Sequence, residues 1–133
     1  MASNGNGSVI DLDVLRPDPR VVRLGGNDID VSFVPSGLTF ELEQIVQDMT
    51  KLSVKDIEGG DREQVRKGFD LAIDLCSLFC QHRYPEMTRE WFLANTDAGQ
   101  LQVFAESIKD ALIKSYEGVK RYQQSPPKAK TKK

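Results

Sequence analysis

The sequence predicts an α+β fold that is mostly helical, with an N-terminal β-hairpin followed by a small bundle of about four helices around a buried central helix. Two short β-rich runs flank a Gly-rich turn, and the segments after them repeat apolar residues at helical spacing. One of these helical segments is apolar around most of its circumference. A chain of 133 residues is the size of one domain with a real hydrophobic core.

Composition divides the chain into three parts. We expect a flexible, extended N-terminal arm over residues 1–19, a single hairpin-plus-helices domain over 20–124, and a disordered Lys-rich tail over 125–133. The last eight residues, PPKAKTKK, contain four lysines and no acid. The other 125 residues carry 14 Lys and Arg against 20 Asp and Glu, so the body is acidic, which disfavours nucleic-acid binding. No run approaches the roughly 18 apolar residues of a membrane span.

The hairpin is predicted in RVVRLGGNDIDVSFV, with strands RVVRL and IDVSFV separated by GGND. Glycine and Asn-Asp tolerate the positive φ angles that a tight turn requires. Alternation places Ile29, Val31 and Phe33 on one face of the second strand. That face must pack on the helices, because an isolated hairpin is only marginally stable.

The first two helices follow from apolar periodicity and capping signals. The first is predicted in LTFELEQIVQDMTKL, with Thr39 as its N-cap. The second begins at Asp61, with Gln64 at capping-box spacing, and runs to about residue 82. Its polar side chains, Ser77 among them, form one narrow stripe, and the remaining apolar arc of roughly 220° is far wider than that of a surface helix. We therefore expect this helix at the centre, with neighbours on two sides.

The last two helices have similar start signals. Pro85 ends the central helix, and MTREWFLAN restarts the chain with Thr88 as N-cap. Asp97 with Gln100 repeats the capping spacing and opens the longest helix. The inner stripe of that helix is predicted to contain Leu101, Phe104, Ala105, Ile108, Leu112, Ser115, Val119 and Tyr122.

The stretch LCSLFCQHRY is the best candidate for a metal or redox site. Cys76 and Cys80 lie one helical turn apart, and the only histidine, His82, follows. A structural zinc site needs four ligands and a catalytic one three, and the sequence contains no further Cys or His. Buried cysteine is common as a small hydrophobic residue. We interpret both cysteines as core packing, and predict no metal and no cofactor.

Two other patterns also receive structural interpretations. Asp70 and Asp74 form a carboxylate pair, which we expect to be a solvated stripe salt-bridged to Arg66 and Lys67. LGGND lacks the remainder of a phosphate-binding motif and precedes a strand, so a hairpin turn explains it better. With no nucleophile motif either, we predict no catalytic residues and no enzymatic activity.

Exposed aromatic residues are the candidates for binding a partner. Trp91 and Phe92 are adjacent, so on a helix they diverge by ~100°. Either both belong to the core, or one lies on a binding surface, where large aromatic residues are frequent anchors. The predicted partner-binding residues are Phe40, Trp91, Tyr116 and Tyr122.

The order of these elements resembles the tail assembly chaperones of long-tailed (siphovirus-like) bacteriophages. The resemblance covers residues 20 to about 120. It is carried by RVVRLGGNDIDVSFVPSGLTFELEQIV, in which Leu38, Thr39 and Glu41 match the step into the first helix, and by YPEMTREWFLANTDAGQLQVFAESIKDAL. In the second segment a proline precedes Met87 and Thr88, similar to the family's pattern.

The resemblance implies a non-enzymatic chaperone that binds the tape measure protein and helps recruit tail tube subunits. It implies action in the bacterial host cytoplasm and absence from the mature virion. The alternative is a structural phage component such as a head–tail adaptor or a minor tail protein. A regulator that binds nucleic acid through its Lys-rich tail is disfavoured by the acidic body, and homo-oligomerisation stays open.

Overall fold

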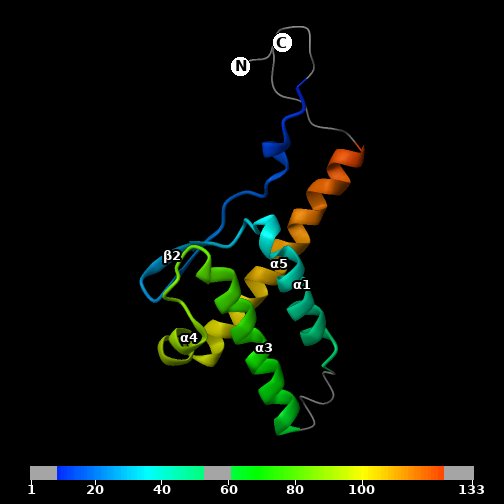
Figure 1. Ribbon diagram of the computed structural model, residues 1–133. Helices are drawn as coiled ribbons and strands as arrows, with labels where there is room; N and C mark the ends of the chain where they lie inside the picture. The colour runs from blue at the N-terminus through cyan, green and yellow to red at the C-terminus, as the bar shows by residue number, and fades with distance from the viewer. Residues whose placement is uncertain (1–8, 53–60, 125–133) are drawn as a thin grey trace.

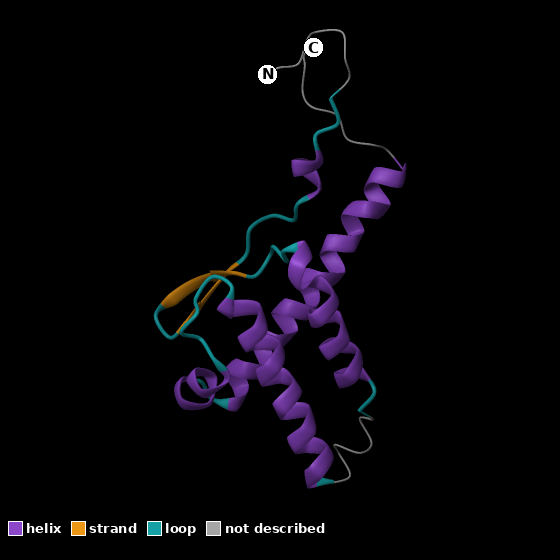
Figure 2. Ribbon diagram, in the orientation of Figure 1, coloured by secondary structure: helices purple, strands orange, loops and turns teal. Residues whose placement is uncertain are grey.

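The computed structural model describes residues 9–52 and 61–124, and it confirms the predicted fold class. An antiparallel two-stranded hairpin is followed by helices that pack together (Figures 1 and 2). The described elements are η1 (Leu12–Leu15), β1 (Val21–Leu24), β2 (Asn27–Asp30), α1 (Ser36–Thr50), α3 (Arg62–Gln81), α4 (Arg89–Asn95) and α5 (Ala98–Gln124). The predicted Lys-rich tail and residues 1–8 of the predicted arm lie outside the described residues.

The part of the arm that is described contains one 3-10 turn, η1, which lies along the second half of α5 (Figure 1). A Cβ added to Gly118 would lie 3.0 Å from the carbonyl oxygen of Leu15, so the small residue on α5 allows this approach. The guanidinium of Arg16 lies 3.8 Å from the centre of the Phe33 ring, a cation–π contact. Arg20 is ion-paired with Asp110 of α5.

The hairpin turn is shorter than predicted. Gly25 and Gly26 alone form it, with φ angles of 57° and 82°, and Asn27 already pairs with Leu24 in the strand register. Two glycines suffice because a two-residue type I′ turn needs positive φ at both positions and matches the twist of the strands. The predicted strand boundary at Ile29 is therefore wrong.

The predicted inner face of the second strand is correct for two of its three residues. Ile29 and Val31 are buried, whereas Phe33 is partly exposed beside the arm. Alternation ends because β2 stops at Asp30, whose carboxylate accepts hydrogen bonds from the backbone N–H and the hydroxyl of Ser32 at 2.8 and 2.6 Å. After this local turn Ser32 is buried, and Phe33 lies against Arg16 of the arm, 37% exposed.

Helix α1 begins three residues before the predicted N-cap. Its first helical residue is Ser36, directly after Pro35, and no side chain caps it. Thr39 lies inside the helix, where its hydroxyl donates to the Pro35 carbonyl at 3.4 Å. The predicted role of Thr39 as N-cap is wrong, because the helix has already begun at Ser36 and Pro35 is the residue at the N-cap position.

Helix α3 is the central helix, but only its second half is enclosed. Its N-cap is Asp61, as predicted, whose carboxylate accepts from the N–H groups of Glu63 and Gln64 at 3.1 and 3.4 Å. The buried residues are Ala72, Ile73, Leu75, Cys76, Ser77, Phe79 and Cys80. The placement of Ser77 on the polar stripe was wrong: it is buried, and its hydroxyl donates to the Asp74 carbonyl at 3.3 Å.

The first turns of α3 do not have the predicted second neighbour. Val65 and Phe69 are substantially exposed, because this end of α3 projects past α4 and α5 (Figure 1). Helix α4 has only seven residues and covers α3 over a short length. The wide apolar arc of α3 is therefore buried in the second half of the helix and exposed to solvent near its N-terminus.

The two C-terminal helices begin as predicted. The hydroxyl of Thr88 accepts from the N–H of Trp91 at 3.2 Å. Asp97 and Gln100 form a reciprocal capping box, with N–H to oxygen distances of 2.9 and 2.8 Å. The predicted inner stripe of α5 is buried from Leu101 to Leu112, but Ser115 and Val119 are exposed and Tyr122 is half-buried. Beyond Leu112 the helix extends past the central helix (Figure 1).

Candidate partner-binding surfaces

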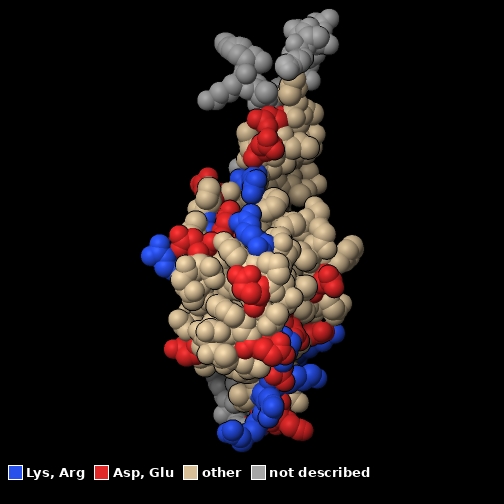
Figure 3. Space-filling model, turned by 60° about the vertical axis from the view of Figure 1, so that its left-hand side comes forward, with Lys and Arg blue, Asp and Glu red and all other residues tan. Residues whose placement is uncertain are grey.

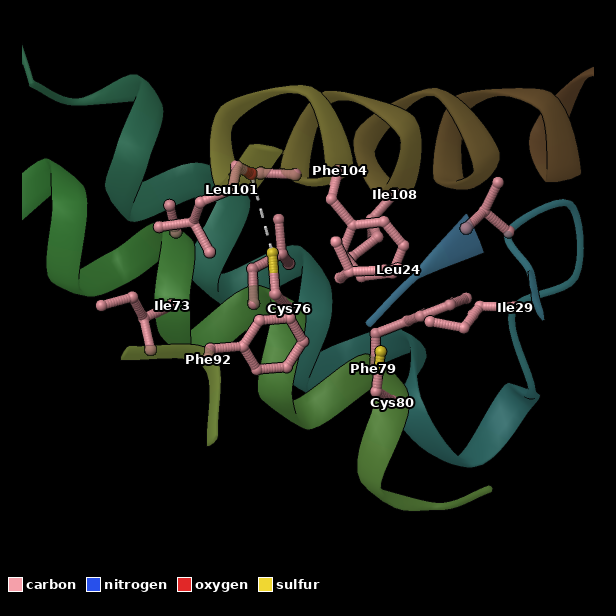
Figure 4. Packing of buried hydrophobic residues seen from close by; sticks show 14 of the residues in the cluster. Leu24, Ile29, Ile73, Cys76, Phe79, Cys80, Phe92, Leu101, Phe104 and Ile108 are labelled. Atoms are coloured by element: carbon pink, nitrogen blue, oxygen red, sulfur yellow. Dashed lines mark hydrogen bonds between the residues drawn. The ribbon is translucent and has the colours of Figure 1, made fainter. Parts of the chain in front are cut away.

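The two cysteines are part of the core, as predicted. Cys76 and Cys80 are both free and buried, and they point from α3 into the apolar cluster beside α5 (Figure 4). The sulfur of Cys76 lies 3.9 Å from the Leu101 carbonyl oxygen. Burial raises the pKa of the Cys80 thiol to about 12. Burial, together with the neighbouring Cys80, also raises the pKa of Cys76 well above its usual value. The Nδ1 atom of His82 lies 2.7 Å from the carbonyl oxygen of Phe79, three residues earlier at the end of α3.

We expect both thiols of the folded protein to resist iodoacetamide at mildly alkaline pH. The reactive species is the thiolate, and the raised pKa of Cys80 leaves about a thousandfold less of it than an ordinary thiol has. Mass spectrometry of intact protein after timed labelling measures the reaction. The same protein in concentrated guanidinium chloride should label fully at both positions, and fast labelling of the folded protein would contradict the buried placement.

The carboxylate pair on α3 is neutralised from α4, and not from α3 itself as predicted. The guanidinium of Arg89 forms an ion pair with Asp74 and lies 3.7 Å from the Asp70 carboxylate. Arg89 also donates to the Asp70 backbone carbonyl at 3.3 Å. Arg89 can reach both acids because the turn after α3 folds α4 back along it. These ion pairs connect α4 to α3.

Two of the four predicted binding residues lie at one groove between α1 and α5. Phe40 is 87% exposed and Tyr116 is 49% exposed, and both line a groove of about 370 Å³. The α1–α5 groove is lined by Val34, Ser36, Thr39, Phe40, Glu43, Ser115, Tyr116 and Val119. The Tyr116 hydroxyl donates a hydrogen bond to the Glu43 carboxylate, which raises the pKa of Tyr116 and connects the two helices. The groove thus combines exposed apolar side chains with a polar pair.

The other two predicted residues lie elsewhere. Trp91 is half-buried under the hairpin turn, where a Cβ added to Gly25 would meet two of its ring atoms at 2.6 Å. Its ring also contacts the buried ring of Phe92 edge-on, with centroids 5.1 Å apart. Trp91 therefore joins the hairpin to α4. Tyr122 is half-buried near the end of α5 and is not among the residues that line the α1–α5 groove.

A second groove, between α3 and α4, was not predicted from the sequence. It has a volume of about 560 Å³. The α3–α4 groove is lined by Arg62, Val65, Arg66, Phe69, Asp70, Arg89 and Leu93. Lys and Arg side chains, interspersed with acidic ones, gather at this end of the molecule (Figure 3). The sequence feature that corresponds to this groove is the width of the apolar arc on the central helix, which predicts burial on two sides.

No protein-family model, curated protein or solved structure matches the chain. Across residues 9–52 and 61–124, no three His, Cys, Asp or Glu side chains are grouped in a way that could hold a metal ion. In the same part of the chain, none of the helices has both the length and the apolar character needed to cross a bilayer. Function is therefore inferred from the two grooves and from the sequence pattern.

Proposed function

We propose that the protein is a non-enzymatic tail assembly chaperone of long-tailed bacteriophages, which binds the tape measure protein and helps recruit tail tube subunits. It acts in the bacterial host cytoplasm and is not retained in the mature virion. The observation that carries the proposal is the exposure of Phe40, 87%, at a groove that Tyr116 also lines. Exposing a large aromatic side chain to water has no benefit for the fold, whereas buried aromatic anchors dominate the energetics of interfaces.

The chemistry of the α1–α5 groove fits an amphipathic helix. Phe40, Tyr116 and Val119 provide exposed apolar surface, and Glu43 and Ser115 provide polar groups at the same groove. An amphipathic helix laid into such a groove buries its apolar side chains and leaves its polar face in water. A tape measure protein is long and helical, and its apolar stripes require cover before assembly.

The surroundings of the two cysteines and of the carboxylate pair on α3 support a binding role rather than a catalytic one. The thiols of Cys76 and Cys80 are buried with raised pKa values, so they are poor nucleophiles. Asp70 and Asp74 both face the guanidinium of Arg89, so the two carboxylates have the same ion-pair partner and lack the contrasting environments of a catalytic acid and base. Each of these groups has a structural role in the packing of α3.

The proposal is tested by co-expression with the tape measure protein from the genome that encodes this chain. We expect the wild-type protein to raise the soluble yield of that partner and to co-purify with it. Phe40→Asp should weaken the complex by about 2 kcal/mol, roughly 30-fold, because it places a charge where an apolar anchor was. Pull-down yield and titration calorimetry measure the loss.

Val103→Asp is the matched control, since Val103 is 66% exposed on α5 and lines neither groove. It should bind like the wild type. Equal loss from both variants, or no complex with any neighbouring gene product, would refute the proposal. The alternative, a head–tail adaptor or minor tail protein, predicts that mass spectrometry detects the chain in purified virions.

A further inference from the structure

The α3–α4 groove has an apolar surface that nothing in the described structure covers. Val65 and Phe69 lie one helical turn apart on α3 and are 42% and 41% exposed, and Leu93 on α4 is 56% exposed. All three line the same groove. A row of apolar side chains at this spacing is complementary to the i, i+4 stripe of a second helix.

The charges around this apolar surface are unbalanced. Three arginines and one aspartate line the groove. Arg89 is paired with Asp70 and Asp74, so its charge is already compensated. Arg62 and Arg66, one turn apart on α3, form no ion pair with any residue that the structure describes. The lining of the groove therefore has an excess of positive charge, contributed by Arg62 and Arg66, in a protein whose first 125 residues carry 14 Lys and Arg against 20 Asp and Glu.

We infer that the α3–α4 groove is a second binding site, separate from the α1–α5 groove, for an amphipathic helix whose apolar stripe is flanked by acidic side chains. The apolar stripe packs on Val65, Phe69 and Leu93, and the flanking carboxylates pair with Arg62 and Arg66. The C-terminal segment of this chain is a poor occupant, because its four lysines would be repelled by the arginines. The inference goes beyond the proposed function, since it requires neither the tape measure protein nor the α1–α5 groove.

A designed peptide tests the inference directly. The probe is a fluorescein-labelled helix of about 18 residues, with leucine at i, i+3 or i+4, and i+7, and glutamate beside each leucine. Its matched control has lysine at every glutamate position. Fluorescence anisotropy with the full-length protein should show about tenfold tighter binding of the glutamate peptide. The difference should shrink as salt is added, because these charges lie at the surface.

Variants locate the site. The double variant Arg62→Glu, Arg66→Glu should remove the preference for the glutamate peptide. It should still fold, because acidic residues near the N-terminus of α3 interact favourably with the helix dipole. Phe69→Asp should weaken both peptides, with circular dichroism confirming the fold. Phe40→Asp, in the other groove, should bind both peptides like the wild type.

Three results would overturn the inference. The first is equal affinity for the two peptides, and the second is a glutamate-peptide affinity that the arginine reversals leave unchanged. The third is a wild-type dimer in sedimentation velocity that the reversals dissociate, because the groove would then be a contact between copies of this chain. None of these results affects the co-expression test with Phe40→Asp. The inference of a second site can therefore be refuted while the proposed function stands, and the reverse.

Discussion

Replacing Phe104 with alanine is expected to lower the free energy of unfolding by about 3–5 kcal/mol. The Phe104 side chain is 2% exposed and lies where three helices meet. Its ring stacks on Phe92 of α4 with centroids 6.2 Å apart and contacts Phe79 of α3 edge-on at 6.3 Å (Figure 4). Alanine would leave a cavity in this cluster that the rigid helices around it can fill only in part. Urea denaturation followed by circular dichroism measures the loss.

The neighbouring residue provides the control for this prediction. Val103 precedes Phe104 on the same helix but is 66% exposed, so Val103→Ala should change the free energy of unfolding by less than about 0.5 kcal/mol. Both variants remove side-chain volume from the same turn of α5, and they differ in burial. Similar losses from the two would mean that α5 does not contribute Phe104 to the core.

The helices could be predicted because local chemistry specifies them. Asp61, Thr88 and Asp97 each begin a helix where the sequence indicated, because their side chains satisfy backbone N–H groups at the first turn. The start of α1 could not be predicted in this way. Ser36, Gly37 and Thr39 are all acceptable near a helix start, so residue preference alone does not select among them, and the helix begins at Ser36 without a side-chain cap.

The binding surfaces were less predictable, because exposure depends on the lengths of neighbouring helices. Phe40 and Tyr116 were selected as aromatic residues, and nothing in the sequence indicated that α1 and α5 would bring them to one groove. Val65 and Phe69 lie on the wide apolar arc of α3, and the width of that arc predicts burial. The short α4 leaves both side chains exposed, which periodicity along α3 alone does not reveal.

Gly25→Ala is expected to destabilise the fold by about 2–4 kcal/mol, more than the same change at Gly26. Both glycines have positive φ angles, 57° and 82°, and an alanine there costs about 1–2 kcal/mol of backbone strain. At Gly25 the new Cβ would also lie 2.6 Å from two atoms of the Trp91 ring, whereas nothing lies within 4 Å at Gly26. Thermal and urea unfolding of the two variants should therefore differ by about 1–3 kcal/mol, the usual cost of overpacking.

A double-mutant cycle with Trp91→Phe separates the two contributions. The ring atoms that meet the added Cβ belong to the outer ring of the indole, which phenylalanine lacks. In the Trp91→Phe background, the two glycine substitutions should cost nearly the same, because only backbone strain remains. If Gly25→Ala stays more costly there, the contact between the hairpin turn and α4 is not its cause. Equal costs with Trp91 present would mean that this aromatic ring does not support the turn, and that it is free to bind a partner as the sequence pattern allowed.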